Sequence, residues 1–272
     1  MVDDGSTVTP YVVEMAGLTD GGRVRPLNED SFVVIQPAAV GGGYLAVAGV
    51  FDGVGGRAHG ARASSAAAES LTHMVAGSSV SRVPGRAPKV ELEGLMRRCH
   101  ERLRREGRRD PALRGMATTA TVALVPNAFP LTLWIGHVGD SPAFRLRSGR
   151  LHKLTKDDSV VGDLVEEGLV APEDAVGHPQ RHLITQALGS DRGITPHAAA
   201  HPVELGDRYL LCTDGLTAMV SEDVIWAILE AESPTRACKH LIRAANDAGG
   251  IDNITVVVIW FRPQPPLRGD AC

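Results

Sequence analysis

The sequence has no long apolar run, few cysteines and little net charge. No stretch approaches the roughly 18 apolar residues that cross a bilayer, and the start, MVDDGSTVTP, is acidic where a signal peptide would be basic and then apolar. The cysteines, Cys99, Cys212, Cys238 and Cys272, show neither CxxC spacing nor a dense disulfide framework. These absences predict a cytoplasmic protein with reduced thiols and no membrane insertion.

Charge and composition place the chain among ordinary globular proteins. With 272 residues, 43% of them apolar and 22% charged, it can bury a sizeable core as one large domain or two small ones. The formal charge of −4 gives no overall basic field, so nucleic acid is not an expected partner. The basic stretch at residues 97–109, RRCHERLRREGRR, lacks interleaved aromatics and is interpreted as a solvated helix face.

Short β-rich runs dominate the pattern of the chain. They predict strands at residues 31–35, 44–51, 118–125, 131–138, 143–154, 208–212 and 254–261. Helices are predicted over residues 61–74 and 90–105, and two more after Ser221 and Ser233. Because consecutive strands are too close for regular βαβ crossovers, we expect an α+β fold with mainly antiparallel sheets packed together and helices outside.

Four aspartates stand at the edges of β-like runs, each next to Gly or Asn. They are Asp52, Asp140, Asp214 and Asp252, in VFDGVGG, HVGDSP, LCTDGL and GGIDNIT. A single Asp-Gly pair is usually a plain turn, but four such sites suit Mg²⁺ or Mn²⁺, which take hard oxygen ligands and bridging carboxylates. Gly53 would let the backbone approach closely enough for its carbonyl to be a further ligand. The aspartates lie too far apart for an EF-hand loop of about 12 residues, so only the fold can bring them together.

Several motifs, in order along residues 11–261, resemble those of bacterial protein phosphatase 2C, the metal-dependent serine/threonine protein phosphatases. They are GGRVRPLNEDSF, VFDGVGG, GMATTATVAL, IGHVGDSPAFRLRSGRLHKLTKDDS, HPQRHLITQALG, GDRYLLCTDGLTAMVSE and GGIDNITVVV. The resemblance implies a four-layer α-β-β-α sandwich with a binuclear Mn²⁺ or Mg²⁺ centre in a cleft at one end. It also implies hydrolysis of phosphoserine or phosphothreonine by direct attack of a metal-bridging hydroxide.

The same resemblance assigns roles to the aspartates. Asp52 would bridge both ions, and the carbonyl of Gly53 would bind the second. Asp214 and Asp252 would bind the first ion. Asp140, together with Asp214, would hold a weaker third ion.

Further residues are expected near the reacting phosphate. Arg25 matches the family's phosphate-binding arginine, a role that suits a guanidinium because its planar fork grips two phosphate oxygens. With Asp52 it forms the predicted catalytic pair. Glu29 and Asp30 would hydrogen-bond metal-bound waters, and Asn253 would orient the aspartate before it.

The sequence departs from the family pattern beside the centre. Val54 follows the Asp-Gly pair where eukaryotic members carry a histidine, so the group that protonates the leaving oxygen stays open between a metal-bound water and His59. Pro142 replaces the arginine of the usual GDSR. It removes a positive side chain and a backbone donor beside Asp140, which changes the setting of the third ion.

We divide the chain into an N-terminal extension (residues 1–10), a catalytic domain (residues 11–261) and a flexible C-terminal tail (residues 262–272). Within the domain, residues 157–180 resemble the mobile flap that borders the cleft in bacterial members. Acidic side chains there would favour basic residues in a substrate, although a charge run is more often a solvated face. They are Asp157, Asp158, Asp163, Glu166, Glu167, Glu173 and Asp174.

The expected partners are phosphorylated proteins, the targets of a separate serine/threonine protein kinase, and the chain is expected to be a monomer. Two alternatives stay open. One is a phosphatase dedicated to a sigma-factor regulator, and the other is a pseudophosphatase that binds a phosphoprotein without turnover. The pseudophosphatase is disfavoured because a scaffold has no need of four convergent carboxylates whose repulsion only a cation relieves.

Overall fold

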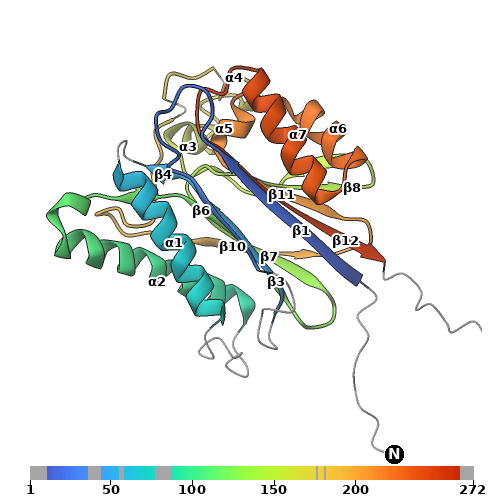
Figure 1. Cartoon of the computed structure of the whole chain (residues 1–272), viewed down its shortest axis with the longest axis horizontal. Coiled ribbons are helices and arrows are strands. Elements are labelled where there is room, and N and C mark those ends of the chain that lie inside the picture. The colour runs from blue at the N-terminus through green and yellow to red at the C-terminus, as the bar shows by residue number, and fades with distance from the viewer. Residues whose placement is uncertain are drawn as a thin grey trace, which may run out of the picture.

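The computed structural model has two five-stranded sheets at its centre (Figure 1). It describes residues 11–35, 44–54, 58–76, 87–175, 177–180 and 182–263. The predicted N-terminal extension and the predicted tail from residue 264 onward lie outside these ranges. In both sheets the neighbouring strands pair antiparallel, as the sequence predicted.

Each sheet is built from strands that are not all consecutive along the chain. The first sheet has the order β1 (Tyr11–Asp20), β12 (Ile254–Pro263), β11 (Arg208–Cys212), β8 (Ala143–Arg147) and β9 (Arg150–Lys153). The second has the order β10 (His197–Pro202), β7 (Thr132–Val138), β6 (Ala120–Pro126), β3 (Tyr44–Phe51) and β2 (Ser31–Ile35). A short separate pair joins β4 (Gly53–Val54) to β5 (Ala117–Thr118).

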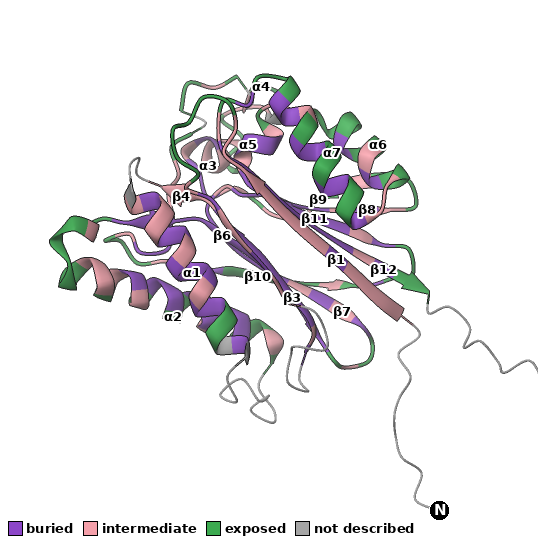
Figure 2. Cartoon of the chain, viewed as in Figure 1, coloured by how far each residue is buried: buried purple, intermediate pink, exposed green. Residues whose placement is uncertain are grey.

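Helices cover the outer face of each sheet. Helices α1 (Ala58–Ala76) and α2 (Pro88–Arg109) pack on the second sheet, and α6 (Glu222–Ala231) and α7 (Pro234–Asp247) on the first. Shorter helices are η3 (Pro111–Leu113), α3 (Val160–Glu166), α4 (Pro172–Ala175) and α5 (Asp214–Thr217). One apolar cluster lies between the sheets and one beneath each helix pair, so buried residues line the inner faces of the layers (Figure 2). The predicted four-layer α-β-β-α sandwich is confirmed.

Most predicted strands form where their patterns place them, but two edge strands carry no such pattern. Strands β2, β3 and β11 occupy the predicted residues. Strand β12 continues to Pro263, so two residues assigned to the C-terminal tail belong to the sheet. Strands β1 and β10 were not predicted from the sequence; both are edge strands with mostly half-buried or exposed residues. Neither shows the alternation of buried and exposed residues that marks a half-buried strand.

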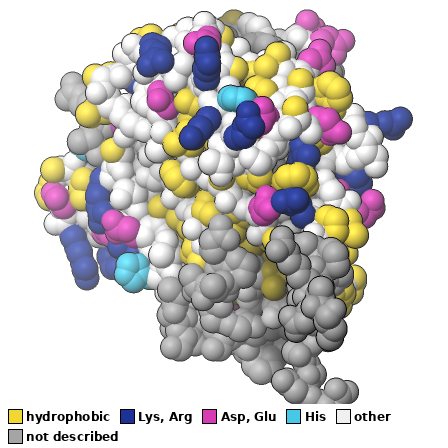
Figure 3. All heavy atoms as spheres, turned by 45° about the vertical axis from the view of Figure 1, so that its right-hand side comes forward, with side chains coloured by type: hydrophobic (Ala, Val, Ile, Leu, Met, Phe, Trp, Pro, Cys, Tyr) yellow, Lys and Arg dark blue, Asp and Glu magenta, His cyan; other side chains and the backbone are white. Residues whose placement is uncertain are grey.

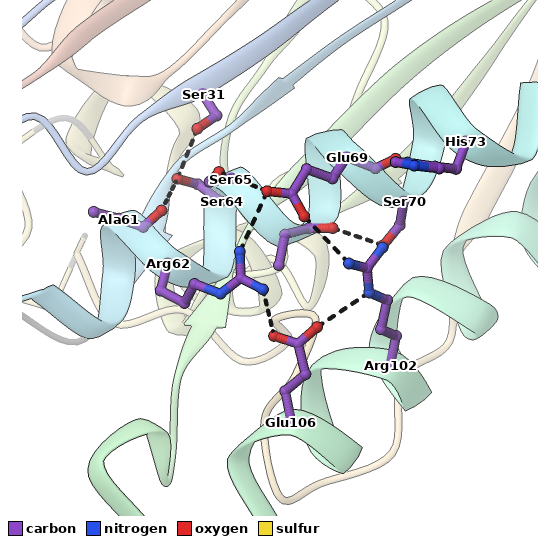
Figure 4. Close-up of polar contacts among 11 residues, drawn as sticks. Ser31, Ala61, Arg62, Ser64, Ser65, Glu69, Ser70, His73, Arg102 and Glu106 are labelled. Atoms are coloured by element: carbon purple, nitrogen blue, oxygen red, sulfur yellow. Dashed lines mark hydrogen bonds and ion pairs between the residues drawn. The ribbon is translucent and has the colours of Figure 1, made fainter. Parts of the chain in front are cut away.

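A ring of four charged side chains ties α1 to α2 (Figure 4). Arg62 contacts Glu106 at 2.8 Å and Glu69 at 3.3 Å. Arg102 contacts the same two carboxylates at 3.1 and 3.2 Å, and its Nη1 donates to Ser70. Because each charge has an opposite neighbour on either side, the ring holds the two helices in register.

The surface outside this ring mixes both signs of charge. On the face drawn in Figure 3, basic and acidic side chains are interspersed over the described part of the surface. None of the helices in the described ranges has the length and apolar character of a membrane span.

Candidate metal centre

The strand directions bring the four aspartates to one end of the sandwich. Asp52 follows β3 and Asp140 comes shortly after β7, and these strands run parallel because both are antiparallel to β6. Asp214 follows β11 and Asp252 precedes β12, and this pair is antiparallel. Each sheet therefore contributes two aspartates at one end, where β4, α5 and the loop between β1 and β2 also lie (Figure 1).

Asp52 lies at the centre of this group. The pKa of its carboxyl group is raised well above the ordinary value. The main cause is burial, followed by the negative charges of Asp30, Asp214, Asp140 and Asp252. Its backbone is fixed by β5 and the residue after it. Thr119 Oγ1 accepts from the Asp52 N–H at 3.0 Å, and Thr118 Oγ1 donates to the Asp52 carbonyl at 2.8 Å. This role of the threonines of GMATTATVAL was not predicted from the sequence.

Gly53 occupies a place where three backbone segments meet. A Cβ there would lie 2.4 Å from the Gly60 carbonyl and 2.5 Å from the Glu29 carbonyl oxygen. Its N–H donates to that Glu29 carbonyl at 3.2 Å. Glycine is required here because the first turn of α1 and the β1–β2 loop pack directly on this residue. The role of its carbonyl as a metal ligand stays a prediction.

Asp140 and Asp214 lie in one electrostatic environment. Burial, then the charges of Asp214 and Asp157, raise the pKa of Asp140 to about 8. Burial and Asp252 raise the pKa of Asp214, while a hydrogen bond with Asp52 opposes that rise. Such carboxylates repel one another when ionised.

Pro142 and Asp158 shape the backbone beside Asp140. The Pro142 carbonyl accepts from Cys212 N–H at 3.1 Å, so the proline extends the contact between β8 and β11 without needing a donor of its own. Asp158 Oδ2 accepts from Gly139 N–H at 2.9 Å, and Asp158 Oδ1 accepts from Gln186 Nε2 at 3.0 Å. Asp158 thus braces the turn that presents the aspartate.

The acidic flap prediction is wrong for Asp158 and weaker for several neighbours. Asp158 is 5% exposed and supports the turn at Gly139, so it does not lie on a substrate-facing surface. Lys153 contacts Asp157 at 2.8 Å, and Lys156 pairs with Asp163 and with Glu166. These internal ion pairs neutralise much of the charge that the sequence appeared to offer to a basic substrate.

Arg25 and Asp252 form an ion pair across the centre. Arg25 Nη2 donates to Asp252 Oδ2 at 2.7 Å, and the other oxygen of Asp252 accepts from the Asn253 N–H at 2.8 Å. This contact raises the pKa of Arg25, and half of the Arg25 side chain is exposed. Both oxygens of Asp252 are therefore engaged. Across the described ranges, no three Asp, Glu, His or Cys side chains are grouped as ready ligands for one ion.

Asn253 has a larger structural role than the orienting role predicted for it. Its Nδ2 donates to the carbonyls of Gly21 at 3.0 Å and Leu27 at 2.9 Å, and its Oδ1 accepts from the Glu29 N–H at 2.8 Å. The side chain is almost fully buried. One amide thus fixes the whole β1–β2 loop, which carries Arg25, against the start of β12.

Glu29 and Asp30 place carboxylate oxygens at the base of the centre. Thr213 and Thr255 donate to Asp30 Oδ2 at 2.9 and 2.7 Å. Burial raises the pKa of Asp30 to about 7 although these two donors oppose it. Among the described residues, Glu29 Oε1 and Asp30 Oδ1 are buried without a hydrogen-bond partner. Thr213, directly before Asp214, and Thr255, two residues after Asn253, were not singled out in the sequence.

The donor set fits hard divalent cations. The side chains that meet here are carboxylates, and burial followed by the charges of neighbouring carboxylates raises the pKa of Asp52 and of Asp140. Two buried oxygens among the described residues lack hydrogen-bond partners. Mg²⁺ and Mn²⁺ bind such oxygen donors and retain several waters. His59 lies at the start of α1, and Val54 lies in β4. The group that protonates the leaving oxygen, a metal-bound water or His59, stays a prediction.

The chain belongs to the protein phosphatase 2C family, whose family model matches residues 26–241. It is 37% identical over 264 residues to serine/threonine protein phosphatase PstP of Mycobacterium tuberculosis, which covers 95% of this chain and 48% of that protein. It is 31% identical to serine/threonine phosphatase stp of Listeria monocytogenes, over 89% of this chain and 93% of that one. The chain thus spans about half the length of PstP but nearly the full length of stp.

Solved structures agree with this assignment. A crystal structure of the Mycobacterium tuberculosis PstP/Ppp phosphatase has a TM-score of 0.80 and 35% identity, covering 92% of this chain and 99% of that one. The PstP catalytic domain in complex with two manganese ions has a TM-score of 0.78 and 33% identity, covering 93% and 99%. The names of these relatives describe serine/threonine phosphatases and give no support to the sigma-factor or pseudophosphatase alternatives.

Proposed function

We propose that this chain is a metal-dependent protein phosphatase that hydrolyses phosphoserine and phosphothreonine in other proteins. It would hold two Mn²⁺ or Mg²⁺ ions through Asp52, Asp214, Asp252 and the carbonyl of Gly53. One observation carries the proposal: four aspartates from separate strand ends meet, and burial, followed by the neighbouring negative charges, raises the pKa of Asp52 well above its ordinary value. A divalent cation relieves the repulsion among these charges.

The bound ions would supply positive charge and lower the pKa of water enough to give a nucleophile at neutral pH. Arg25 would grip the substrate phosphate with two parallel N–H donors. The Asn253 amide already holds the loop that carries this arginine. Glu29 and Asp30 offer acceptor oxygens that would position water in the centre.

The same group of carboxylates supports the proposal of a weaker third ion between Asp140 and Asp214. The pKa of Asp140 is raised to about 8 because the residue is buried and because the Asp214 and Asp157 carboxylates lie near it. The Pro142 carbonyl is satisfied by Cys212. The proline therefore leaves the aspartate turn intact, which supports retention of this ion.

The substrates would be phosphoproteins made by a serine/threonine protein kinase. The similarity to serine/threonine protein phosphatases supports this class of substrate. Helices of the same chain cover the outer faces of both sheets, which supports a monomer. The buried free thiols of Cys99, Cys212 and Cys238 are compatible with the cytoplasm.

Hydrolysis of p-nitrophenyl phosphate and of a phosphothreonine peptide tests the proposal. We expect turnover with Mn²⁺, abolition by a chelator, and loss of turnover in Asp214→Ala. Calorimetric titration of Mn²⁺ gives a second measurement, in which Asp214→Ala should lose binding. Asp223→Ala removes an exposed carboxylate from the first turn of α6 and should leave both intact. Unchanged turnover in Asp214→Ala, or in chelator, would contradict the proposal.

A further inference from the structure

We propose that a pocket at the C-terminal end of α2 is a docking site for a negatively charged residue of the substrate protein, a few positions from the residue being dephosphorylated. The proposal rests on the phosphatase function above and adds a preference for acidic or multiply phosphorylated substrates. The pocket has a volume of about 330 Å³. Its walls are the last turns of α2, the turn at residues 111–116 and the loop at Gly189–Asp191.

Three arginines line this pocket, and none has a carboxylate partner in the part of the chain that the structure describes. Arg104 and Arg108 come from α2, and Arg114 comes from the turn that follows it. None of the three forms an ion pair with a residue in the described ranges, which distinguishes them from Arg102 in the ring of Figure 4. A guanidinium without a carboxylate keeps its N–H donors available for a phosphate or carboxylate ligand. Asp191 is the single acidic residue among the described lining.

Glycines give the pocket its shape. A Cβ at Gly107 would lie 3.0 Å from the Leu113 carbonyl oxygen, so this glycine lets the turn fold back onto the helix. Gly189 has a φ of +86°, and a Cβ there would lie 2.6 Å from the Met116 carbonyl oxygen. Leu103 and Met116 also line the pocket, and both are fully buried. An apolar floor with a cationic rim suits a charged residue together with the polypeptide around it.

The pocket adjoins the metal centre through a short stretch of backbone. Met116 is two residues before Thr118, which pairs with Gly53 and donates to the Asp52 carbonyl. Thr118 also bridges to Leu188, the residue before Gly189. Two residues of extended chain span roughly 7 Å, so a substrate segment of a few residues can reach from the phosphate to the arginines.

Two simpler accounts explain less. Arginines at a helix C-terminus complement the helix dipole, but this does not explain why Arg114, from a separate segment, faces the same pocket. Nucleic acid would also bring negative charge. The described lining residues include no aromatic side chain for base stacking, and the chain has a formal charge of −4. A polypeptide ligand is therefore favoured.

The test compares three phosphothreonine peptides that differ at one position, three to five residues from the phosphothreonine to be hydrolysed. That position holds a neutral residue in the first peptide, glutamate in the second and another phosphothreonine in the third. The wild type should show a lower KM for the two anionic peptides than for the neutral one. In Arg104→Gln/Arg108→Gln/Arg114→Gln, the KM for the anionic peptides should rise about tenfold at low salt, with kcat and p-nitrophenyl phosphate hydrolysis unchanged. Asp191→Asn should lower the same KM. The two anionic peptides show whether phosphate or carboxylate is preferred.

The matched control is Arg105→Gln/Arg109→Gln, which removes exposed arginines from the same helix that do not line the pocket. It should leave KM unchanged. Equal discrimination by the triple variant and the wild type would overturn the inference, as would an oligonucleotide that competes for the pocket better than the peptides. Absence of all Mn²⁺-dependent turnover would instead refute the phosphatase proposal. Fluorescence anisotropy of a labelled acidic peptide would still test the pocket without catalysis.

Discussion

Strand β11 carries an aspartate just outside each end, and the two have opposite environments. Before the strand, Asp207 is 1% exposed and accepts from Arg147 Nε at 2.7 Å, from Arg147 Nη2 at 2.6 Å and from the Glu204 N–H at 2.9 Å. After the strand, Asp214 lies among other carboxylates, and its pKa is raised. The first carboxylate is compensated inside the chain and stabilises the fold. The second leaves charge for a ligand from outside to compensate.

The largest expected effect is in the uncompensated group. Asp52→Asn should lower Mn²⁺-dependent turnover at least about a thousandfold, since metal-ion catalysis supplies several kcal/mol of barrier reduction. The same change should raise the melting temperature of the metal-free protein, because it removes one of the repelling charges. Kinetics with Mn²⁺ and calorimetry in chelator measure the two effects. A lower melting temperature would show that this carboxylate stabilises the fold.

The compensated end should respond in the opposite manner. Asp207→Asn should destabilise the protein by about 3 kcal/mol, because it leaves the Arg147 guanidinium without its buried partner. The folded fraction should keep its turnover per molecule. Urea unfolding and kinetics well below the midpoint measure this. Arg243→Gln breaks an exposed ion pair with Asp247 and should cost well under 1 kcal/mol. A similar cost for both variants would remove the distinction between the two ends.

The carboxylates of the metal centre, unlike Asp207, should make the stability of the protein fall with rising pH. In the metal-free protein the pKa of Asp30 is raised to about 7 and that of Asp140 to about 8. The native state therefore keeps protons that the unfolded chain releases above about pH 4. Stability should fall as pH rises from 4 to 8, by up to about 1.4 kcal/mol per pH unit for each group. Urea titrations in chelator measure this slope, and Asp140→Asn should flatten it. Stability that rises over this interval would contradict the raised values.

The smallest effect concerns the threonine that supports Asp30. Thr255→Val removes a donor to Asp30 Oδ2 and should destabilise the protein by about 1 kcal/mol. The loss should be larger at pH 8 than at pH 5, because the ionised carboxylate needs its donors more than the protonated form does. Thr72→Val removes a local hydroxyl bond on the surface of α1 and serves as the control. Equal losses at both pH values would show that Thr255 acts only through packing.

Much of the fold and the principal residues of the site follow from local pattern. The central strands are marked by β-branched runs between turn residues. An aspartate next to such a run can therefore be placed at the end of a strand from the sequence alone. Strands β1 and β10 carry weaker patterns because most of their residues are half-buried or exposed. The hydrogen bonds of Asn253 and Thr213, the burial of Asp158 and the Arg25–Asp252 pair join segments that lie far apart in the chain. No local sequence rule could predict them, because each depends on how the layers pack.

The division of the aspartates between the two sheets has a mechanical consequence. Asp52 and Asp140 follow strands of one sheet, while Asp214 and Asp252 flank strands of the other. An ion held by both groups would act as a cross-link between two layers that share an apolar cluster at their core. Separating the sheets would then require releasing the metal first. Metal loading should therefore slow unfolding and hydrogen exchange in both sheets at once, including strands distant from the catalytic end.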